Sequence, residues 1–145
     1  MNYLADSNIL TTLSQEYSPK FKPLRLFLTD LFRGGDFIYI VPQNLIEYWT
    51  VATRPAESNG LGLSVDEATI EIERYKKYFQ LRRSFQDSYI IWESLVIKYR
   101  VMGKNTHDAH LVAAMIQNNI THILTFNGKD FKRFDEVIVV DPTGI

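Results

Sequence analysis

Short apolar runs alternate along the chain with longer stretches in which apolar residues recur every three or four positions. The short runs are rich in β-branched and aromatic residues, which is typical of buried strands. They predict strands at 3–5, 37–41, 120–126 and 137–140. The three-to-four spacing predicts helices at 9–15, 24–32, 42–52, 65–79, 88–100 and 107–118. Because helices separate most successive strands, we expect an α/β domain with a mainly parallel sheet covered on both faces.

Residues that start or stop helices lie at several of these boundaries. Gly34–Gly35 is expected to end the second helix, and Arg54–Pro55 the third, since a proline disfavours helical backbone in the residue before it. Ser64 and Glu67 form a capping box for the fourth helix, and Thr106 is expected to cap the last one. One face of the fourth helix is predicted to be buried, and it consists of Val65, Ala68, Ile72, Tyr75 and Phe79.

Composition narrows the classes of chemistry. The length of 145 residues fits one domain spanning residues 1–145. The chain has no cysteine, which excludes disulfide scaffolds, cysteine-ligated zinc, iron–sulfur clusters and thiol nucleophiles. Sixteen basic and 17 acidic residues give a net charge of −1, so a strongly basic nucleic-acid coat is absent while a local basic patch remains open. With only three histidines, carboxylates are the more abundant candidates for chemistry.

Signals for export or membrane insertion are weak in this sequence. The segment from Met1 to Asp6 lacks the basic and apolar regions of a secretory signal. The longest uncharged stretch, at 109–128, is interrupted by polar residues and does not resemble a transmembrane helix. We therefore expect a cytoplasmic protein.

Four carboxylates are predicted near the carboxyl ends of the strands, where open α/β sheets bind their ligands. Asp6 directly follows the first strand, and Asp130 lies shortly after the 120–126 strand. Asp108 lies in the first turn of the helix at 107–118, and Glu47 lies in the second turn of the helix at 42–52. Clustered carboxylates repel one another, and a hard divalent cation such as Mg²⁺ or Mn²⁺ relieves that repulsion. Such a cation can activate a water and shield a phosphate, so the cluster predicts phosphodiester or phosphoryl chemistry.

Each carboxylate considered alone also has a simpler structural explanation. Asp6 could serve only as a helix cap, Asp108 could be favoured by the helix dipole, and Asp130 could fix a turn. Glu47 is harder to explain in this way, because its apolar neighbours indicate a buried helix and a buried carboxylate usually has a partner. The convergence of all four is less expected by chance than the placement of any one.

Four segments, spread over nearly the whole length of the chain, resemble the motifs of the PIN-domain nucleases in order. They are Tyr3–Leu10, Asn44–Pro55, Gly103–Ala114 and Leu124–Phe131. The first resembles the family's opening strand, with its metal-binding Asp at Asp6 and an Asn at Asn8. The second and third resemble the motifs that carry an active-site Glu and a metal-binding Asp, here Glu47 and Asp108. Each motif alone is weak, but four in the right order are fairly specific.

The resemblance implies a three-layer α/β/α fold with a sheet of about five strands, and Mg²⁺- or Mn²⁺-dependent cleavage of RNA, often by a homodimer. Many small bacterial members are VapC-type toxins, each neutralised by an antitoxin encoded beside it. The catalytic residues implied are Asp6, Glu47, Asp108 and Asp130, and the metal-binding residues are Asp6, Glu47, Asp108 and Asn127. Many members carry Asp where this chain has Asn127, and an amide lacks the charge to bind a cation strongly. Either Asp130 compensates or the second metal position is weak.

Residues beside these motifs are expected to support the site. Asn8 and Thr125 are predicted to orient the ligands. Lys104, Lys129 and Arg54 are predicted to bind RNA because they flank the motifs and carry the positive charge that the acidic site lacks.

Two other groups of residues are more distant from the motifs. The basic and aromatic residues at 74–83 are interpreted as a solvated helix face rather than as an RNA-binding surface. Trp49 is predicted to lie in the core, whereas Trp92 fits either the interior or an interface with a second subunit or an antitoxin.

Two rival functions stay open. Another acidic α/β phosphoryl-transfer enzyme would need a second acid close to Asp6, where this chain has Asn8 instead. A PIN-like module that binds RNA or protein without catalysis is favoured only by Asn127, and the presence of Asp6 together with Glu47 and Asp108 speaks against it.

Overall fold

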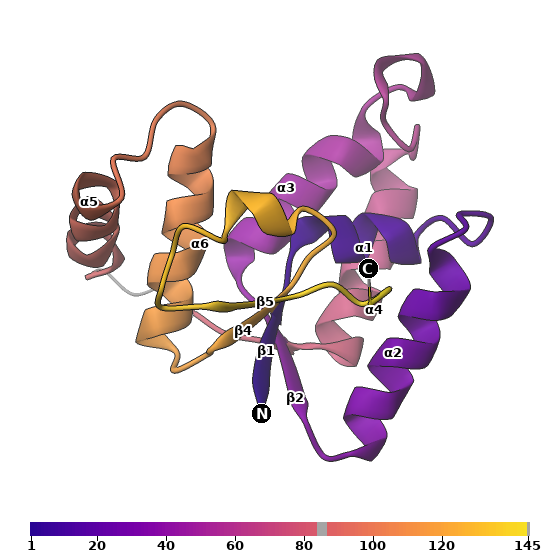
Figure 1. Cartoon of the computed structure of the whole chain (residues 1–145). Coiled ribbons are helices and arrows are strands. Elements are labelled where there is room, and N and C mark those ends of the chain that lie inside the picture. The colour runs from indigo at the N-terminus through magenta and orange to yellow at the C-terminus, as the bar shows by residue number, and fades with distance from the viewer. Residues whose placement is uncertain (84–86, 145) are drawn as a thin grey trace.

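A parallel five-stranded sheet runs through the centre of the molecule (Figure 1). The computed structural model describes residues 1–83 and 87–144. Within them the strand order is β3-β2-β1-β4-β5, and every neighbouring pair is parallel. The strands are β1 (Asn2–Ala5), β2 (Phe37–Ile40), β3 (Gln80–Leu81), β4 (His122–Leu124) and β5 (Ile138–Val140). The predicted α/β class and parallel sheet are confirmed.

Helices cover both faces of the sheet, which gives the three layers expected (Figure 1). One face packs against α5 (Ser88–Lys98) and α6 (Asn105–Gln117). The other face is covered by α1 (Ser7–Leu13), α2 (Phe21–Arg33), α3 (Pro42–Thr53) and α4 (Val65–Tyr78). Two short 3₁₀ turns, η1 (Ala56–Ser58) and η2 (Gly128–Asp130), lie in the connections.

The central strands divide their side chains between two hydrophobic cores. Leu4 and Ile123 belong to the core beneath α5 and α6. Their neighbours Ala5 and Leu124 belong to the core beneath α1–α4. Successive side chains of a strand point to opposite faces, so a strand between two helix layers must be apolar at every position. This is why the predicted strands read as unbroken apolar runs.

Most helix boundaries agree with the local signals in the sequence. Gly35, directly after the end of α2, has φ +83°, a conformation that glycine adopts without strain. The helix α3 ends at Thr53, and Arg54 is extended before Pro55. The side chain of Ser64 accepts from the Glu67 backbone N–H while the Glu67 carboxylate accepts from the Ser64 N–H, so the capping box is confirmed.

The predicted cap of α6 is wrong. Gly103 turns the chain with φ +64°, and Thr106 donates its N–H to the Gly103 carbonyl. Helical hydrogen bonding therefore starts earlier, α6 begins at Asn105, and Lys104 stands at the cap position without a side-chain hydrogen bond. Thr106 lies inside the first turn instead.

Three details of burial and extent also differ from the prediction. Val65 is 63% exposed because it is the first residue of α4, whereas Ala68, Tyr75 and Phe79 are buried as predicted. Phe37 is 48% exposed at the amino end of β2, so the burial predicted for that strand begins one residue later. The strand β3 was not predicted, because two residues are too short for a pattern.

None of the helices within residues 1–83 and 87–144 combines the length and the apolar character needed to cross a bilayer.

The two tryptophans are both partly buried. Trp92 of α5 packs against α6, where its indole N–H donates to the Thr106 carbonyl at 3.0 Å. Trp49 is partly buried against the core beneath α1–α4.

The strand order locates the place where ligands are expected. From β1 the chain moves to β2 and then β3 on one side, and β4 and β5 lie on the other side of β1. The order therefore reverses between β1 and β4, and ligands of open α/β sheets bind outside the carboxyl ends at such a point. Asp6 lies there, and its backbone N–H donates a hydrogen bond to the Leu124 carbonyl at 3.0 Å.

Candidate active site

An open cleft of about 610 Å³ lies at this edge of the sheet. It is formed by the starts of α1 and α6, by α3 with the residue that follows it, and by η2. Its lining residues are Ser7, Gln43, Ile46, Glu47, Thr50, Val51, Arg54, Lys104, His107, Asp108 and Asp130. Three of the four predicted acids therefore line one cleft, although they come from positions 47, 108 and 130 of the chain.

The fourth acid, Asp6, is buried at the N-terminus of α1. One carboxylate oxygen accepts from the Ser7 backbone N–H at 2.8 Å, so Asp6 does cap its helix. The other accepts from the Thr125 hydroxyl at 2.8 Å and from the Asn8 amide at 3.4 Å. Burial raises the pKa of Asp6 to about 6, and the charges of Glu47 and Asp130 raise it as well, while the bonds from Thr125 and Ser7 lower it.

Glu47 reaches the cleft from the second turn of α3. One carboxylate oxygen accepts from the Ser7 hydroxyl at 3.2 Å, and the other accepts from the Gln43 amide at 2.8 Å. The expectation that apolar neighbours bury this part of the helix is wrong in part, because Ile46 is 66% exposed. Only one face of α3 is buried, and Glu47 is half-buried at its border.

Asp108 lies in the first turn of α6, as predicted. Burial, together with the charges of Asp130, Asp6 and Glu47, raises the pKa of Asp108 to about 7, although the charge of Lys104 lowers it. With the Asn105 amide turned to satisfy both of its neighbours, its nitrogen donates to Asp108 at 3.3 Å. Mutual raising of pKa values is the electrostatic sign of carboxylates that share one small region.

The donors that hold these acids are all neutral. Backbone N–H, hydroxyl and amide groups bind Asp6, Glu47 and Asp108. The ion pairs found in residues 1–83 and 87–144 lie elsewhere, at Met1–Asp36, Arg74–Glu71, Lys76–Glu73 and Lys98–Glu136. The acids are thus held in place without an ion-pair partner among the described residues, so a cation meets no competing basic side chain bonded to them.

The donor chemistry fits a hard divalent cation that keeps part of its water shell. Every candidate ligand is an oxygen atom, which suits Mg²⁺ or Mn²⁺ rather than a soft metal. Across the described part of the chain, no three Asp, Glu or His side chains already converge as a preformed metal cage. Mg²⁺ is commonly bound through one or two carboxylates and several waters, so such a cage is not required.

Known proteins resemble this chain in structure rather than in sequence. No family model matches it, and no curated protein does. Solved structures match over almost its full length. VapBC-1 from nontypeable Haemophilus influenzae aligns with a TM-score of 0.73 at 16% identity, covering 99% of each chain. The chain has a VapC-type, PIN-like fold.

Two further structures with this PIN-like fold show the same likeness. VapBC2 from Rickettsia felis, bound to a DNA fragment from its promoter, gives a TM-score of 0.67 at 15% identity and covers 97% of this chain and 98% of its own. Mycobacterium tuberculosis VapC20, described as a Sarcin-Ricin loop cleaving toxin, gives 0.65 at 16% identity and covers 91% and 95%. At these identities the likeness establishes the fold, and the activity must be argued from the site.

Asn8 and Thr125 lie where an orienting role requires. Both contact the buried carboxylate of Asp6, and the Asn8 amide also donates to the Thr125 hydroxyl at 3.1 Å. The Asn8 side-chain oxygen accepts from the Phe126 N–H at 3.2 Å. These bonds tie the start of α1 to the chain that leaves β4.

Some of the remaining predicted residues line the cleft and others do not. Arg54 and Lys104 line the cleft. Asn127 and Lys129 are exposed and are not among its lining residues, whereas Asp130 is. The Asn127 backbone N–H donates to the Thr125 hydroxyl at 3.0 Å, so the backbone of this residue is tied to the partner of Asp6.

Arg54 is held at the cleft by the loop that follows α3. Gly62 donates its N–H to the Arg54 carbonyl at 2.9 Å. Gly60 packs so closely that a Cβ there would lie 1.9 Å from the same carbonyl oxygen. Only glycine permits this approach, which places the turn directly against the end of the helix.

Sequence reasoning missed Ser7 and Gln43, although both bind Glu47. Gln43 lies four residues before Glu47 on the same helix, and this spacing brings side chains together on one face. That signal was available in the sequence. The contact of Ser7 spans 40 residues of chain and depends on the packing of α1 against α3.

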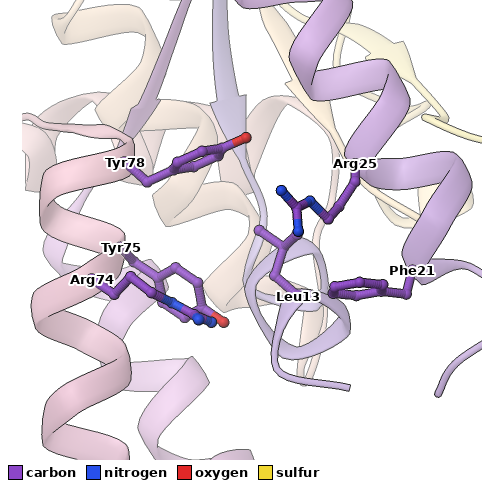
Figure 2. Close-up of a pocket in the computed structure, with 6 residues that line it drawn as sticks. All are labelled: Leu13, Phe21, Arg25, Arg74, Tyr75 and Tyr78. Atoms are coloured by element: carbon purple, nitrogen blue, oxygen red, sulfur yellow. The ribbon is translucent and has the colours of Figure 1, made fainter. Parts of the chain in front are cut away.

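A second, smaller hollow of about 200 Å³ lies between α1, α2 and α4 (Figure 2). Its walls are cationic and aromatic, formed by Leu13, Phe21, Arg25, Arg74, Tyr75 and Tyr78. Residues 74–83 are interpreted from the sequence as a solvated helix face. That interpretation holds for Lys76, which is exposed and pairs with Glu73. It does not hold for Tyr75, which is buried. We call this hollow the arginine–tyrosine pocket.

Proposed function

We propose that this chain is a Mg²⁺- or Mn²⁺-dependent endoribonuclease of the PIN-domain family that hydrolyses RNA phosphodiester bonds in the acidic cleft. One observation carries the proposal. Four carboxylates lie at the switch point of a PIN-like fold, and Asp6, Glu47 and Asp108 are held there by neutral donors rather than by ion pairs. A purely structural cluster would be expected to pair these acids with Lys or Arg.

Asp6, Glu47 and Asp108 would hold the ion through their oxygen atoms, directly or through water. The bound ion supplies a Lewis acid that activates water and offsets the charge of the phosphate. Asp130 lines the cleft and Asn127 does not, so we assign the fourth position to Asp130. Thr125 and Asn8 keep Asp6 oriented, and this matters because outer partners of metal ligands typically contribute to affinity.

The cleft also carries the positive charge that an RNA strand needs. Arg54 and Lys104 line it beside the acids and would contact phosphates upstream and downstream of the scissile bond. Ile46 and Val51 provide an apolar wall on α3 against which an unpaired base can pack. The binding groups are therefore cationic and aliphatic side chains in an open cleft.

We further propose that the chain is the toxin of a toxin–antitoxin pair and forms a homodimer. Support for an antitoxin partner comes from the similar structures, which include a toxin–antitoxin complex from Klebsiella pneumoniae with a TM-score of 0.64 at 19% identity. The homodimer rests on the resemblance to the PIN-domain nucleases alone. Co-expression with the adjacent gene and size-exclusion chromatography with light scattering test both parts. Growth arrest that the adjacent gene relieves, and a mass twice 16.9 kDa for the isolated chain, are expected.

Cleavage of a mixed RNA pool with and without Mn²⁺ tests the nuclease. The decisive variant is Asp6→Asn/Asp108→Asn, which removes two charges from the site while keeping the shape of the side chains. The matched control is Asp30→Asn/Asp66→Asn, which removes the same charge from exposed positions on α2 and α4. We expect metal-dependent cleavage by the native chain and the control, and none by the decisive variant.

The non-catalytic alternative has one observation in its favour, since the described acids do not already form a compact ligand set. It predicts RNA or protein binding without cleavage and no effect of Mn²⁺ on thermal stability. The nuclease proposal predicts a higher Tm with Mn²⁺, because a ligand that binds only the folded state stabilises it. Equal cleavage by a well-folded Asp6→Asn/Asp108→Asn variant would overturn the assignment of the site.

A further inference from the structure

The Gln43 side chain occupies the gap between α3 and α6 beside the acidic cleft. Its amide nitrogen lies 2.8 Å from a carboxylate oxygen of Glu47 and 2.8 Å from the backbone carbonyl of His107. Its oxygen lies 2.5 Å from Nδ1 of His110. One amide thus joins the helix that carries Glu47 to the helix that carries Asp108.

These contacts determine the orientation of the amide. A carboxylate and a carbonyl can only accept hydrogen bonds, so both must face the NH₂ group of Gln43. The amide oxygen then faces His110 and needs a donor, which requires a proton on Nδ1. Turning the amide over would set its oxygen against two acceptors. His110 therefore locks Gln43 in the one orientation that donates to Glu47.

Glu47 needs such a partner because its surroundings repel it. Asp6, Asp108 and Asp130 all lie close enough for their charges to interact with one another or with Glu47. The carboxylate ends a long side chain that is only half-buried, and it would otherwise turn away toward water. Ser7 holds one of its oxygens at 3.2 Å, and Gln43 holds the other at 2.8 Å.

The neutrality of Gln43 matters as much as its geometry. A Lys or Arg at this position would hold Glu47 equally well, but it would neutralise the charge and compete with a cation. An amide donates a hydrogen bond and leaves the net charge of the cluster unchanged.

We propose that Gln43 is a positioning residue for Glu47, and that His110 orients the Gln43 amide so that the Glu47 carboxylate faces the cation-binding cluster. The inference rests on the proposed metal-dependent function and adds to it two residues that act through Glu47, of which Gln43 also lines the cleft. Through the bonds of Gln43 to His107 and His110, α3 is joined to α6 beside the cleft.

The first test measures Mn²⁺ affinity by calorimetry on the full chain, without RNA. The variant Gln43→Met keeps the length of the side chain and removes its hydrogen bonds. We expect its dissociation constant for Mn²⁺ to rise roughly tenfold, as is usual when an outer partner of a metal ligand is lost. The control is Gln15→Met, a residue whose amide bonds only the Thr11 carbonyl of its own segment. It should bind Mn²⁺ like the native chain.

A double-mutant cycle separates positioning from mere support of the fold. In the background of Glu47→Gln, the step Gln43→Met should change Mn²⁺ affinity by less than twofold, since the group that it positions is gone. A tenfold loss in both backgrounds would show a structural tie between the helices and would overturn the inference. Unchanged affinity of Gln43→Met in the native background would overturn it while the proposed function stands. A native chain that neither binds Mn²⁺ nor cleaves RNA would overturn both.

The second test needs no metal and no variant of Gln43. Nitrogen-15 NMR of the histidine rings at pH 8 reports which ring nitrogen carries the proton, and the signal that is absent in His110→Phe identifies His110. We expect the Nδ1–H form. A ring protonated only at Nε2 would leave Nδ1 as an acceptor, Gln43 would have to turn over, and the inference would be wrong.

Discussion

The acidic cleft and the arginine–tyrosine pocket lie toward opposite ends of α1. A charged side chain of the pocket is ion-paired, whereas the acids of the cleft are not, within the residues that the structure describes. Ser7, at the start of the helix, lines the cleft, and Leu13, at its end, lines the pocket. In the pocket Arg74 is paired with Glu71 at 2.5 Å and lies over the ring of Tyr75. In the cleft Asp6 and Glu47 have only neutral donors.

This difference distinguishes a charge that supports the fold from a charge that is kept for a ligand. A paired arginine on an aromatic ring contributes packing and little net field. An unpaired group of carboxylates raises its own pKa values and destabilises the folded state when no cation is bound. Such a cost is typical of functional sites, where environments are arranged to shift pKa values.

The largest expected difference between the two regions is in activity. Replacing Asp108 by Asn should lower RNA cleavage by more than about a hundredfold, since a ligand should matter more than the outer partners of ligands do. Replacing Arg74 by Gln should change cleavage by less than twofold. Initial rates with Mn²⁺ measure both, and equal effects of the two variants would show that the charge contrast does not mark function.

The next largest effect is a loss of stability, and we expect it from a change in the arginine–tyrosine pocket rather than in the cleft. The Tyr75 hydroxyl donates to the Leu10 carbonyl at 2.9 Å and lies 2.5 Å from the Ser14 hydroxyl. The variant Tyr75→Phe should lower the free energy of unfolding by about 1–3 kcal/mol, because it leaves buried partners unsatisfied. Urea denaturation measures the loss. Cleavage at 25 °C should be unchanged, and a fall in kcat would contradict the separation of the two regions.

Stability without metal should depend on pH through the cleft. The pKa values of Asp6 and Asp108 are raised in the folded state to about 6 and about 7, above their ordinary value of 3.8. The folded state therefore binds more protons, so this contribution is complete below about pH 4 and is lost as the pH rises through 6 to 7.

We expect the Tm of the metal-free chain to be higher at pH 5 than at pH 8 by roughly 3 °C or more. The variant Asp108→Asn should be more stable than the native chain at pH 8 and should show a smaller change with pH. In saturating Mn²⁺ the Tm of the native chain should no longer be higher at pH 5 than at pH 8, because protons and the cation compete for the same oxygens. Thermal scans in EDTA and in Mn²⁺ at the two pH values measure this. An identical pH profile for the native chain and Asp108→Asn would be the contrary result.

The smallest effect is expected for substrate binding by single cations. Replacing Lys104 by Gln should raise KM for RNA modestly and reduce the slope of log affinity against log salt by about one, as for one lost phosphate contact. Replacing Arg25, in the arginine–tyrosine pocket, by Gln should leave that slope unchanged. Cleavage rates across a potassium chloride series measure it, and equal slopes for all three proteins would place RNA elsewhere.

The sequence by itself determined the elements and their class. Unbroken apolar runs and three-to-four spacing are local properties, so they predicted the presence and place of β1, β2, β4, β5 and all six α-helices, although β4 is shorter than the predicted 120–126. Parallel strands must also end at one edge of their sheet. The placement of Asp6, Glu47, Asp108 and Asp130 at this edge therefore followed from their positions after strands and in the first two turns of helices.

Only the tertiary structure decided how those acids are held and which neighbours share the cleft. The hydroxyl of Thr125 reaches Asp6 across 119 residues, and Ser7 reaches Glu47 across 40. No local pattern encodes such contacts, because they depend on the strand order that places β1 beside β4 and on the packing of α1 against α3. The same holds for the residues after β4, where Asp130 lines the cleft and Asn127 is not among its lining residues. Spacing along a chain predicts which residues reach an edge of the sheet, and the direction of each side chain is set by long-range packing.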